Sequence, residues 1–69
     1  MDSEIIFIIE EDALSGYTAR ALGHSIFTEA EDLEVLKDNV REAVRCHFVE
    51  QDRPGIIRLH YVKDEVIAL

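Results

Sequence analysis

The chain has 69 residues, of which 48% are hydrophobic, and its 15 acidic and 7 basic side chains give a formal net charge of −8. This length makes one small domain over residues 1–69, and its acidity disfavours direct binding to nucleic acid, whose phosphates repel it. A single cysteine excludes an internal disulfide, and an N-terminus with only five consecutive apolar residues fits neither a signal peptide nor a membrane span, so we expect a cytoplasmic protein.

The first part of the chain predicts three strands joined by short turns. Residues 4–11, EIIFIIEE, contain five consecutive bulky apolar side chains, which are typical of a central strand buried on both faces. A polar segment that ends at Gly16 leads to a second strand at 17–22, and the turn at Gly23 leads to a third at 25–29. Strands joined this closely form an antiparallel meander.

The segment 32–51, DLEVLKDNVREAVRCHFVEQ, predicts an amphipathic helix. At about 100° per residue, one stripe of this helix carries Leu33, Leu36, Val40, Ala43, Val44 and Phe48. Asp32 is expected to cap the first turn, and the segment 52–55, Asp-Arg-Pro-Gly, is expected to end the helix. His47 lies on the apolar stripe and is expected to be partly buried.

The last part of the chain predicts a fourth strand at 56–62, where apolar and polar residues alternate. Residues 65–69 are expected to form either a short last strand or a flexible tail. A right-handed crossover through the helix returns the fourth strand parallel to the first. The predicted class is therefore α+β, with the element order β-β-β-α-β, an optional fifth strand, the spatial strand order 3-2-1-4, and the helix on one face.

One helix can cover only one face of such a sheet. The covered face is expected to hold Ile5, Phe7, Ile9, Tyr17, Ala19, Ala21, Ile57, Leu59 and Tyr61. The open face is expected to hold Ile6, Ile8, Thr18, Arg20, Arg58 and His60. Because two isoleucines would then sit in water, this face predicts a contact with another protein, preferably a second copy in a twofold homodimer. The alternative is a monomer in which the long arginine side chains shield the isoleucines.

The sequence offers no convergent catalytic, metal or cofactor site. Glu10, Glu11 and Asp12 are consecutive, and neighbours in a strand point to opposite faces, so these carboxylates cannot converge on one ion. The three histidines lack zinc-ligand spacing, Cys46 has no assured base, and the glycines are isolated. We therefore expect no enzyme activity, no metal and no cofactor. The acidic cluster is either a solvated strand end or a contact for a basic partner.

Three stretches together resemble the HicB-like antitoxins. They are the acidic strand end followed by Ser15-Gly16-Tyr17, the turn at Gly23, and the segment IFTEAEDLEVLKDNVREAV at 26–44. The resemblance covers residues 5–48 and implies a partial ribonuclease-H-like fold with the order derived above. It also implies a protein that binds and blocks a small, basic, double-stranded-RNA-binding-like toxin, which cleaves messenger RNA.

Two departures from the family pattern refine this expectation. Full HicB-like antitoxins usually carry a C-terminal DNA-binding domain, whereas only RLHYVKDEVIAL follows the Pro54-Gly55 turn here, so no DNA-binding domain is expected. Leu22 stands where the family usually has a proline. The chain is therefore similar to the compact, solitary subgroup.

The function implied by this resemblance is a non-catalytic module that binds a HicA-like toxin through an acidic surface. The alternative is a solitary homo-oligomeric protein with a structural or regulatory role and no toxin partner. The residues expected to contact a partner are Glu10, Glu11, Asp12, Ile6, Ile8, Arg20, Arg58 and His60. No membrane contact is expected.

Overall fold

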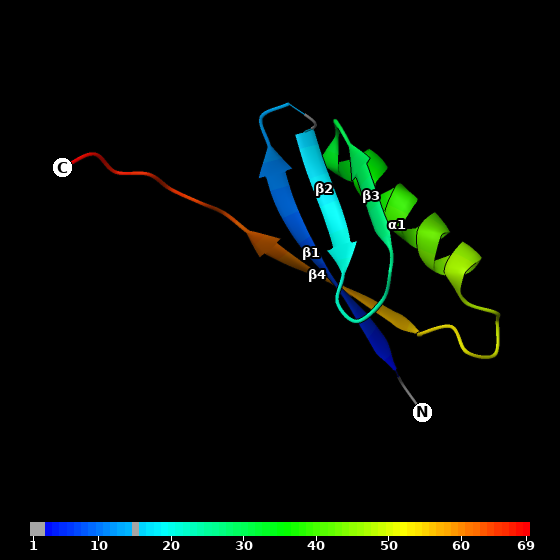
Figure 1. Cartoon of the computed structure of the whole chain (residues 1–69). Helices are drawn as coiled ribbons and strands as arrows, with labels where there is room; N and C mark the ends of the chain where they lie inside the picture. Colours follow the sequence, from blue (N-terminus) through cyan, green and yellow to red (C-terminus); the bar gives the residue numbers. More distant parts are fainter. Residues whose placement is uncertain (1–2, 15) are drawn as a thin grey trace.

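The computed structural model describes residues 3–14 and 16–69, and it shows one four-stranded sheet with one helix packed on it (Figure 1). The elements in chain order are β1 Glu4–Asp12, β2 Gly16–Ala21, β3 Phe27–Ala30, α1 Leu33–His47 and β4 Ile56–Val62. The strand order across the sheet is β3-β2-β1-β4, with β1 parallel to β4 and the other pairs antiparallel. The predicted α+β class and strand order are confirmed. Ser15, which belongs to the predicted family motif, lies outside the described residues.

Strand β1 is central because its apolar side chains need cover on both faces. Toward the helix, Ile5, Phe7 and Ile9 are buried, and Phe7 has no exposed surface. On the other face Ile6 and Ile8 are half-buried, whereas the sequence predicted that they would sit in water unless a partner or the neighbouring arginines covered them. The neighbouring strands account for this difference, because they flank Ile6 and Ile8 with residues of their own.

The core lies between the helix and the sheet. Helix α1 contributes Leu36, Val40 and Val44, which form part of the predicted stripe and are at most 2% exposed. The sheet contributes Ile5, Phe7, Ile9, Ala19 and Ala21, and Ile26 completes the buried set. Ile26 was not predicted as a core residue, since the predicted third strand at 25–29 included it without assigning it to a face. In the structure β3 is Phe27–Ala30, and Ile26 lies in the loop before it. Removing a side chain of this size from a packed interior generally costs about 2–5 kcal/mol.

Helix α1 begins as predicted but ends earlier. The Asp32 side chain accepts hydrogen bonds from the backbone amides of Glu34 (2.7 Å) and Val35 (3.2 Å). The helix ends at His47, four residues before the predicted Gln51, because the backbone of Phe48 turns to an extended conformation with φ −110° and ψ 142°. The expected partial burial of His47 is wrong, because its side chain is exposed.

The helix lies over β2 and β3 and leaves β4 largely uncovered. The predicted covered face is correct in register, since Ile5, Phe7 and Ile9 pair with Ile57, Leu59 and Tyr61. On β4, however, two of these side chains are only half-buried, and Tyr61 is 50% exposed. Burial on this face therefore falls from the centre of the sheet toward β4.

Residues 63–69, which we call the tail, continue β4 away from the body of the molecule (Figure 1). Of the two alternatives for 65–69, the structure shows a tail and no fifth strand. The tail explains the long dimension of 52 Å, against 22 and 19 Å for the other two. It also explains a radius of gyration of 13.5 Å, where about 11 Å is typical of a compact chain of this length.

The start of β2 depends on a glycine. Gly16 has φ +87°, and a Cβ atom at this position would lie 2.6 Å from the Glu31 Cα and 2.7 Å from the Ala30 carbonyl oxygen. Gly23 has a similar φ of +79° but meets nothing within 4 Å. The two glycines therefore share one backbone conformation, but only Gly16 is also held against the backbone of another segment.

We predict that Gly16→Ala lowers the free energy of unfolding by about 2–5 kcal/mol, because it combines an unfavourable φ with a clash against rigid backbone. The matched control Gly23→Ala should cost only the conformational part, about 1–2 kcal/mol. Urea unfolding of both variants measures the difference. Equal losses would contradict the close approach of β2 to residues 30–31.

Candidate functional site

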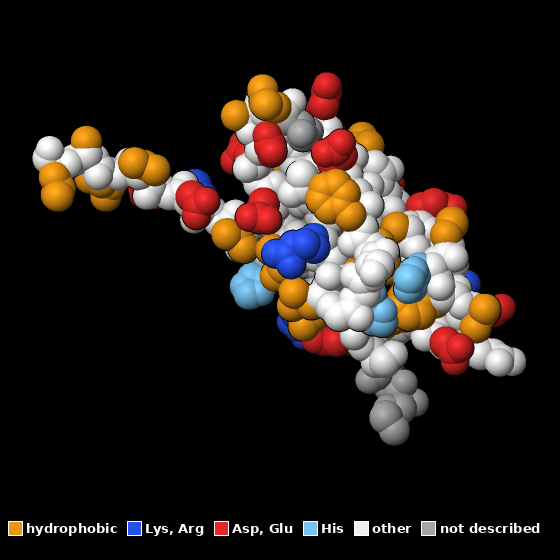
Figure 2. Space-filling view, in the orientation of Figure 1, with side chains coloured by type: hydrophobic (Ala, Val, Ile, Leu, Met, Phe, Trp, Pro, Cys, Tyr) orange, Lys and Arg blue, Asp and Glu red, His pale blue; other side chains and the backbone are white. Residues whose placement is uncertain are grey.

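Acidic side chains gather at one end of the sheet. Glu10 faces Thr18 of β2 and Val62 of β4, and Thr18 in turn faces Glu29 of β3, so two glutamates share the open face. Glu11 pairs with Tyr17 and points to the helix side, as the alternation predicted. Figure 2 shows acidic side chains around this end and along the start of the tail.

A shallow cleft of about 310 Å³ lies at this end of the sheet, lined by Glu10, Glu11, Ala13, Val62, Lys63 and Asp64. We define the acidic end as Glu10, Glu11, Asp12, Glu29 and Asp64. The sequence predicted the first three of these residues. Glu29 and Asp64 were not predicted. The pairing register of the third strand with the second would have placed Glu29 beside Thr18 and so near Glu10.

Asp12 has a structural role in addition to its charge. Its Oδ1 atom accepts a hydrogen bond of 2.7 Å from the backbone amide of Leu14. Such a bond supports the turn between β1 and β2. The carboxylates of the acidic end therefore lie on both faces of the sheet, at the end of β1 and in the tail, an arrangement suited to attracting a positive surface over some distance.

The predicted open-face residues do lie together. Ile8 stands between Arg20 and His60 in one row across the sheet, and Ile6 stands beside Arg58 in the next row. Three exposed apolar side chains join this face by register and were not predicted: Phe27 (62% exposed), Ile56 (46%) and Val62 (40%). The open face is therefore more apolar than the sequence indicated.

An ion pair on the same face ties the start of β1 to β4. Arg58 donates hydrogen bonds of 3.1 and 3.0 Å to the two carboxylate oxygens of Glu4. These bonds lower the pKa of Glu4 below its ordinary value of 4.5 and raise the pKa of Arg58. Arg58 is thus held by Glu4, although the sequence predicted it only as a contact or shielding residue.

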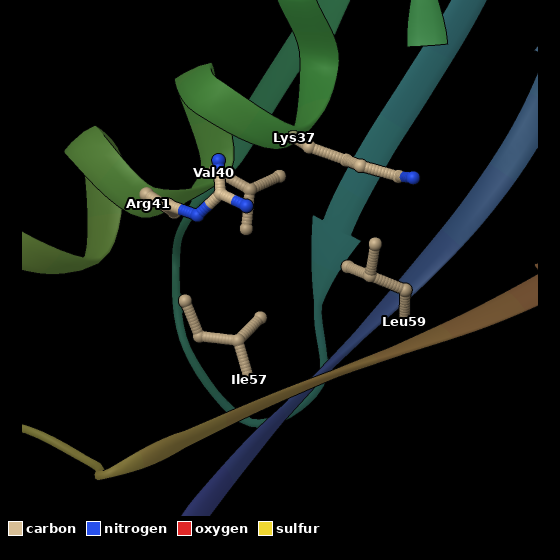
Figure 3. A pocket seen from close by; sticks show the side chains of 5 residues that line it. All are labelled: Lys37, Val40, Arg41, Ile57 and Leu59. Carbon is tan, nitrogen blue, oxygen red and sulfur yellow. The ribbon is translucent and has the colours of Figure 1, made fainter. Parts of the chain in front are cut away.

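A basic, apolar groove runs between α1 and β4. Its first part, a cavity of about 120 Å³, is lined by Lys37, Val40, Arg41, Ile57 and Leu59, and Figure 3 shows open space between the side chains of the helix and those of the strand. The groove continues past Arg41 and Ile57 to a second part lined by Val44, Arg45, Arg53, Pro54 and Gly55. The groove was not predicted from the sequence, because it arises from the position of the helix across the sheet.

The basic residues of the groove also pair along the helix. Lys37, Arg41 and Arg45 lie 3.1, 2.6 and 3.6 Å from the carboxylates at 34, 38 and 42 respectively. The hydrogen bond that Lys37 donates to the Glu34 carboxylate raises the pKa of Lys37. Such exposed pairs contribute little to stability. These bases therefore remain free to exchange partners at the groove.

Within residues 3–14 and 16–69, no group of three or more histidine, cysteine or acidic side chains is placed to hold a metal ion. The rings of His24 and His47 do meet edge-on at 5.8 Å, and both also contact Phe48. The sequence did not predict this contact, because it joins a turn to the end of the helix. In the same residues, no helix is long and apolar enough to span a membrane.

Two curated relatives are both called UPF0150 protein. The relative from Archaeoglobus fulgidus is 62% identical over 52 residues, which cover 75% of this chain and 77% of that protein. The relative from Thermotoga maritima is 36% identical over 66 residues, which cover 96% and 93% of the two chains. No family model matches the chain. No solved structure matches it either.

We predict that Arg58→Gln raises the pKa of Glu4 back toward 4.5, because the variant loses the charged donor. A carboxyl whose pKa is lowered by folding stabilises the folded state above its unfolded pKa, and this contribution is lost as the pH falls below 4.5 through the folded value. In Arg58→Gln this pH dependence should flatten. Carbon-13 NMR titration of the Glu4 carboxyl provides the measurement.

The matched control is Arg20→Gln, which removes the same charge from β2. Arg20 faces Ile8, four positions along β1 from Glu4, so this variant should leave the Glu4 titration unchanged. An equal shift in both variants would mean that general charge, and not the hydrogen-bonded pair, sets the pKa of Glu4.

Proposed function

This chain belongs to the UPF0150 family, and we propose that it is a non-catalytic, HicB-type module of the compact subgroup that binds a small basic protein. The proposed partner is a toxin of the HicA-like class, which the sequence resemblance implies. The proposed place of action is the cytoplasm, where an exposed free thiol such as that of Cys46 stays reduced.

The observation that carries this proposal is the concentration of carboxylates at the acidic end. The strand register places Glu10 and Glu29 two strands apart on one face, and Asp64 lines the same cleft as Glu10 and Glu11. A surface of one sign raises the encounter rate with a partner of the opposite sign. The net charge of −8 extends this attraction beyond the contact itself.

The open face supplies a neighbouring apolar contact. Glu10 lies in the row next to Ile8, and both belong to the open face, so a partner attracted to the acidic end reaches apolar surface at once. Burial of apolar surface then holds the complex, while charge governs how fast it forms. Arg20 and His60 flank Ile8 and limit which basic surfaces fit there.

We predict that Glu10→Lys combined with Glu11→Lys slows association with a HicA-type toxin, by about tenfold or more at low salt. Stopped-flow association with a cleavage-inactive toxin from the same genome measures the rate between about 0.02 and 0.5 M salt, over which the screening length falls from about 20 to 4 Å. The difference between wild type and variant should shrink as salt rises.

The control is Glu34→Lys combined with Asp38→Lys, which makes the same change of charge on the exposed flank of α1. This variant should slow association much less. Rates that do not depend on salt, or equal effects of both double variants, would count against the acidic end as the docking surface.

A second candidate function is a solitary homo-oligomer without a toxin partner. The exposed Phe27, Ile56 and Val62 favour it, because they enlarge the apolar area around Ile6 and Ile8 on the open face. A twofold dimer through this face would bury the patch of one copy against that of another.

For this candidate we predict that Ile8→Glu converts a wild-type dimer into a monomer, because a charge would be buried in the contact. Sedimentation velocity at micromolar concentration distinguishes the dimer from the 7.9 kDa chain. A wild-type monomer, together with a variant of unchanged stability, would exclude the open face as a homodimer contact.

A further inference from the structure

Strand β4 presents an uncovered edge. It lies at the end of the sheet, pairs with β1 on one side, and meets no other strand within the described residues on its outer side. It is seven residues long without a proline, whereas β3 at the opposite edge has four residues and packs beside α1. A long, regular edge with free backbone groups is a template for pairing with another strand.

The tail continues this edge strand and carries apolar side chains into solvent. Val66 is 94% exposed and Ile67 is 81% exposed, and Leu69 is also exposed. Figure 1 shows the tail running on from the end of β4 without turning back to the domain. Apolar side chains in this setting indicate a surface that is covered in an assembly.

We propose that two copies of this chain exchange their tails, each tail pairing antiparallel with the outer edge of the partner's β4. The occupant of the edge is thus a second copy. The seven residues 63–69 supply as many positions as β4 itself. This contact does not require the basic toxin, because it is formed by the backbone edge of β4 and the tail, although Val62 of the open face and Asp64 of the acidic end take part in it.

Symmetry restricts the register of this pairing. Two antiparallel neighbours related by a twofold axis place one residue opposite its own copy. With Val62 opposite the partner's Val62, two apolar side chains meet at the axis. With Lys63 at the axis, two like charges would face each other, which is unfavourable. With Tyr61 at the axis, Ile57 would face the partner's Glu65 and Leu59 the partner's Lys63.

The register centred on Val62 also matches the remaining side chains. His60 faces the partner's Asp64, and Ile56 faces the partner's Ala68. On the helix side, Ile57 faces the partner's Ile67. Apolar cross-strand pairs of this kind stabilise a sheet, and the Asp64 carboxylate can accept a hydrogen bond from the His60 ring.

The groove between α1 and β4 agrees with this register. Ile57 and Leu59 line its open flank, so the partner's Ile67 would lie against apolar surface beneath Arg41 (Figure 3). The partner's Glu65 would lie opposite Leu59, within reach of Lys37 and its neighbouring bases on the groove rim. The tail face that meets the groove carries Glu65 followed by Ile67, and the groove offers bases above an apolar floor.

Crosslinking tests the register directly. In a Cys46→Ser background, Val62→Cys should form a covalent dimer on mild oxidation. Directly opposed antiparallel residues have Cα atoms about 4.5–5.5 Å apart, within the range that a disulfide spans. The matched control Ile56→Cys has similar exposure on the same face and strand, but in this register it faces position 68, so it should remain uncrosslinked. No crosslink at 62, or equal crosslinking at both positions, would overturn the proposal.

Sedimentation of tail variants tests the contact. Ile67→Asp should raise the dimer dissociation constant by at least about a hundredfold, because each dimer loses two buried isoleucines. Val66→Asp is the control. In this register position 66 faces Arg58 on the open face, so an aspartate there meets a positive charge and the variant should still form the dimer. Both positions are highly exposed in the single chain, so neither change should unfold the domain. A wild-type chain that stays monomeric up to the highest soluble concentration, or a dimer lost in Ile8→Glu but kept in Ile67→Asp, would exclude tail exchange.

Discussion

The structure depends on a mismatch between one helix and four strands. A helix with its side chains is about 10–12 Å across, whereas neighbouring strands lie about 4.8 Å apart, so one helix covers little more than two strands. Here α1 covers the β2–β3 side and reaches the centre of the sheet through Leu36, Val40 and Val44. The helix does not cover strand β4 or the opposite face of the sheet. The groove, the exposed edge and the open face all follow from this constraint.

The sequence predicted the features that depend on periodicity and connection. Five consecutive apolar residues placed β1 at the centre, and the short turns followed by one crossover gave the strand order that the structure shows. Periodicity indicates which face of a strand is apolar, but not which neighbouring strands a helix covers. The exposure of Tyr61 and the groove beside Arg41 therefore had no signal in the sequence. The proximity of Glu29 to Glu10 depended on strand register, which hydrophobic alternation alone did not resolve.

Although the net charge is −8, the molecule has one surface that is acidic and another that is basic. The acids at 34, 38 and 42 lie on the exposed flank of α1, whereas the bases at 37, 41 and 45 lie toward β4. The acidic end lies at the far end of β1, where the cleft involves the start of the tail. An acidic protein can thus attract a basic partner at one place and hold an acidic, apolar segment at another. Net charge alone suggests only the first of these associations.

The two proposed associations are linked through one pair of residues. Glu10 lies beside Val62 in the sheet, and Val62 lies at the axis of the proposed dimer. The Glu10 residues of two copies would then be about three strand spacings, or about 14 Å, apart. Their repulsion is largely screened at physiological salt, where the screening length is about 8 Å, but it opposes the dimer at low salt. A basic partner that binds near the axis relieves this repulsion and meets twice the negative charge. Added salt weakens capture of a basic protein. In the dimer it relieves the repulsion between two chains of net charge −8 but also screens the attraction of Glu65 for the groove bases, so the two associations respond differently to ionic strength.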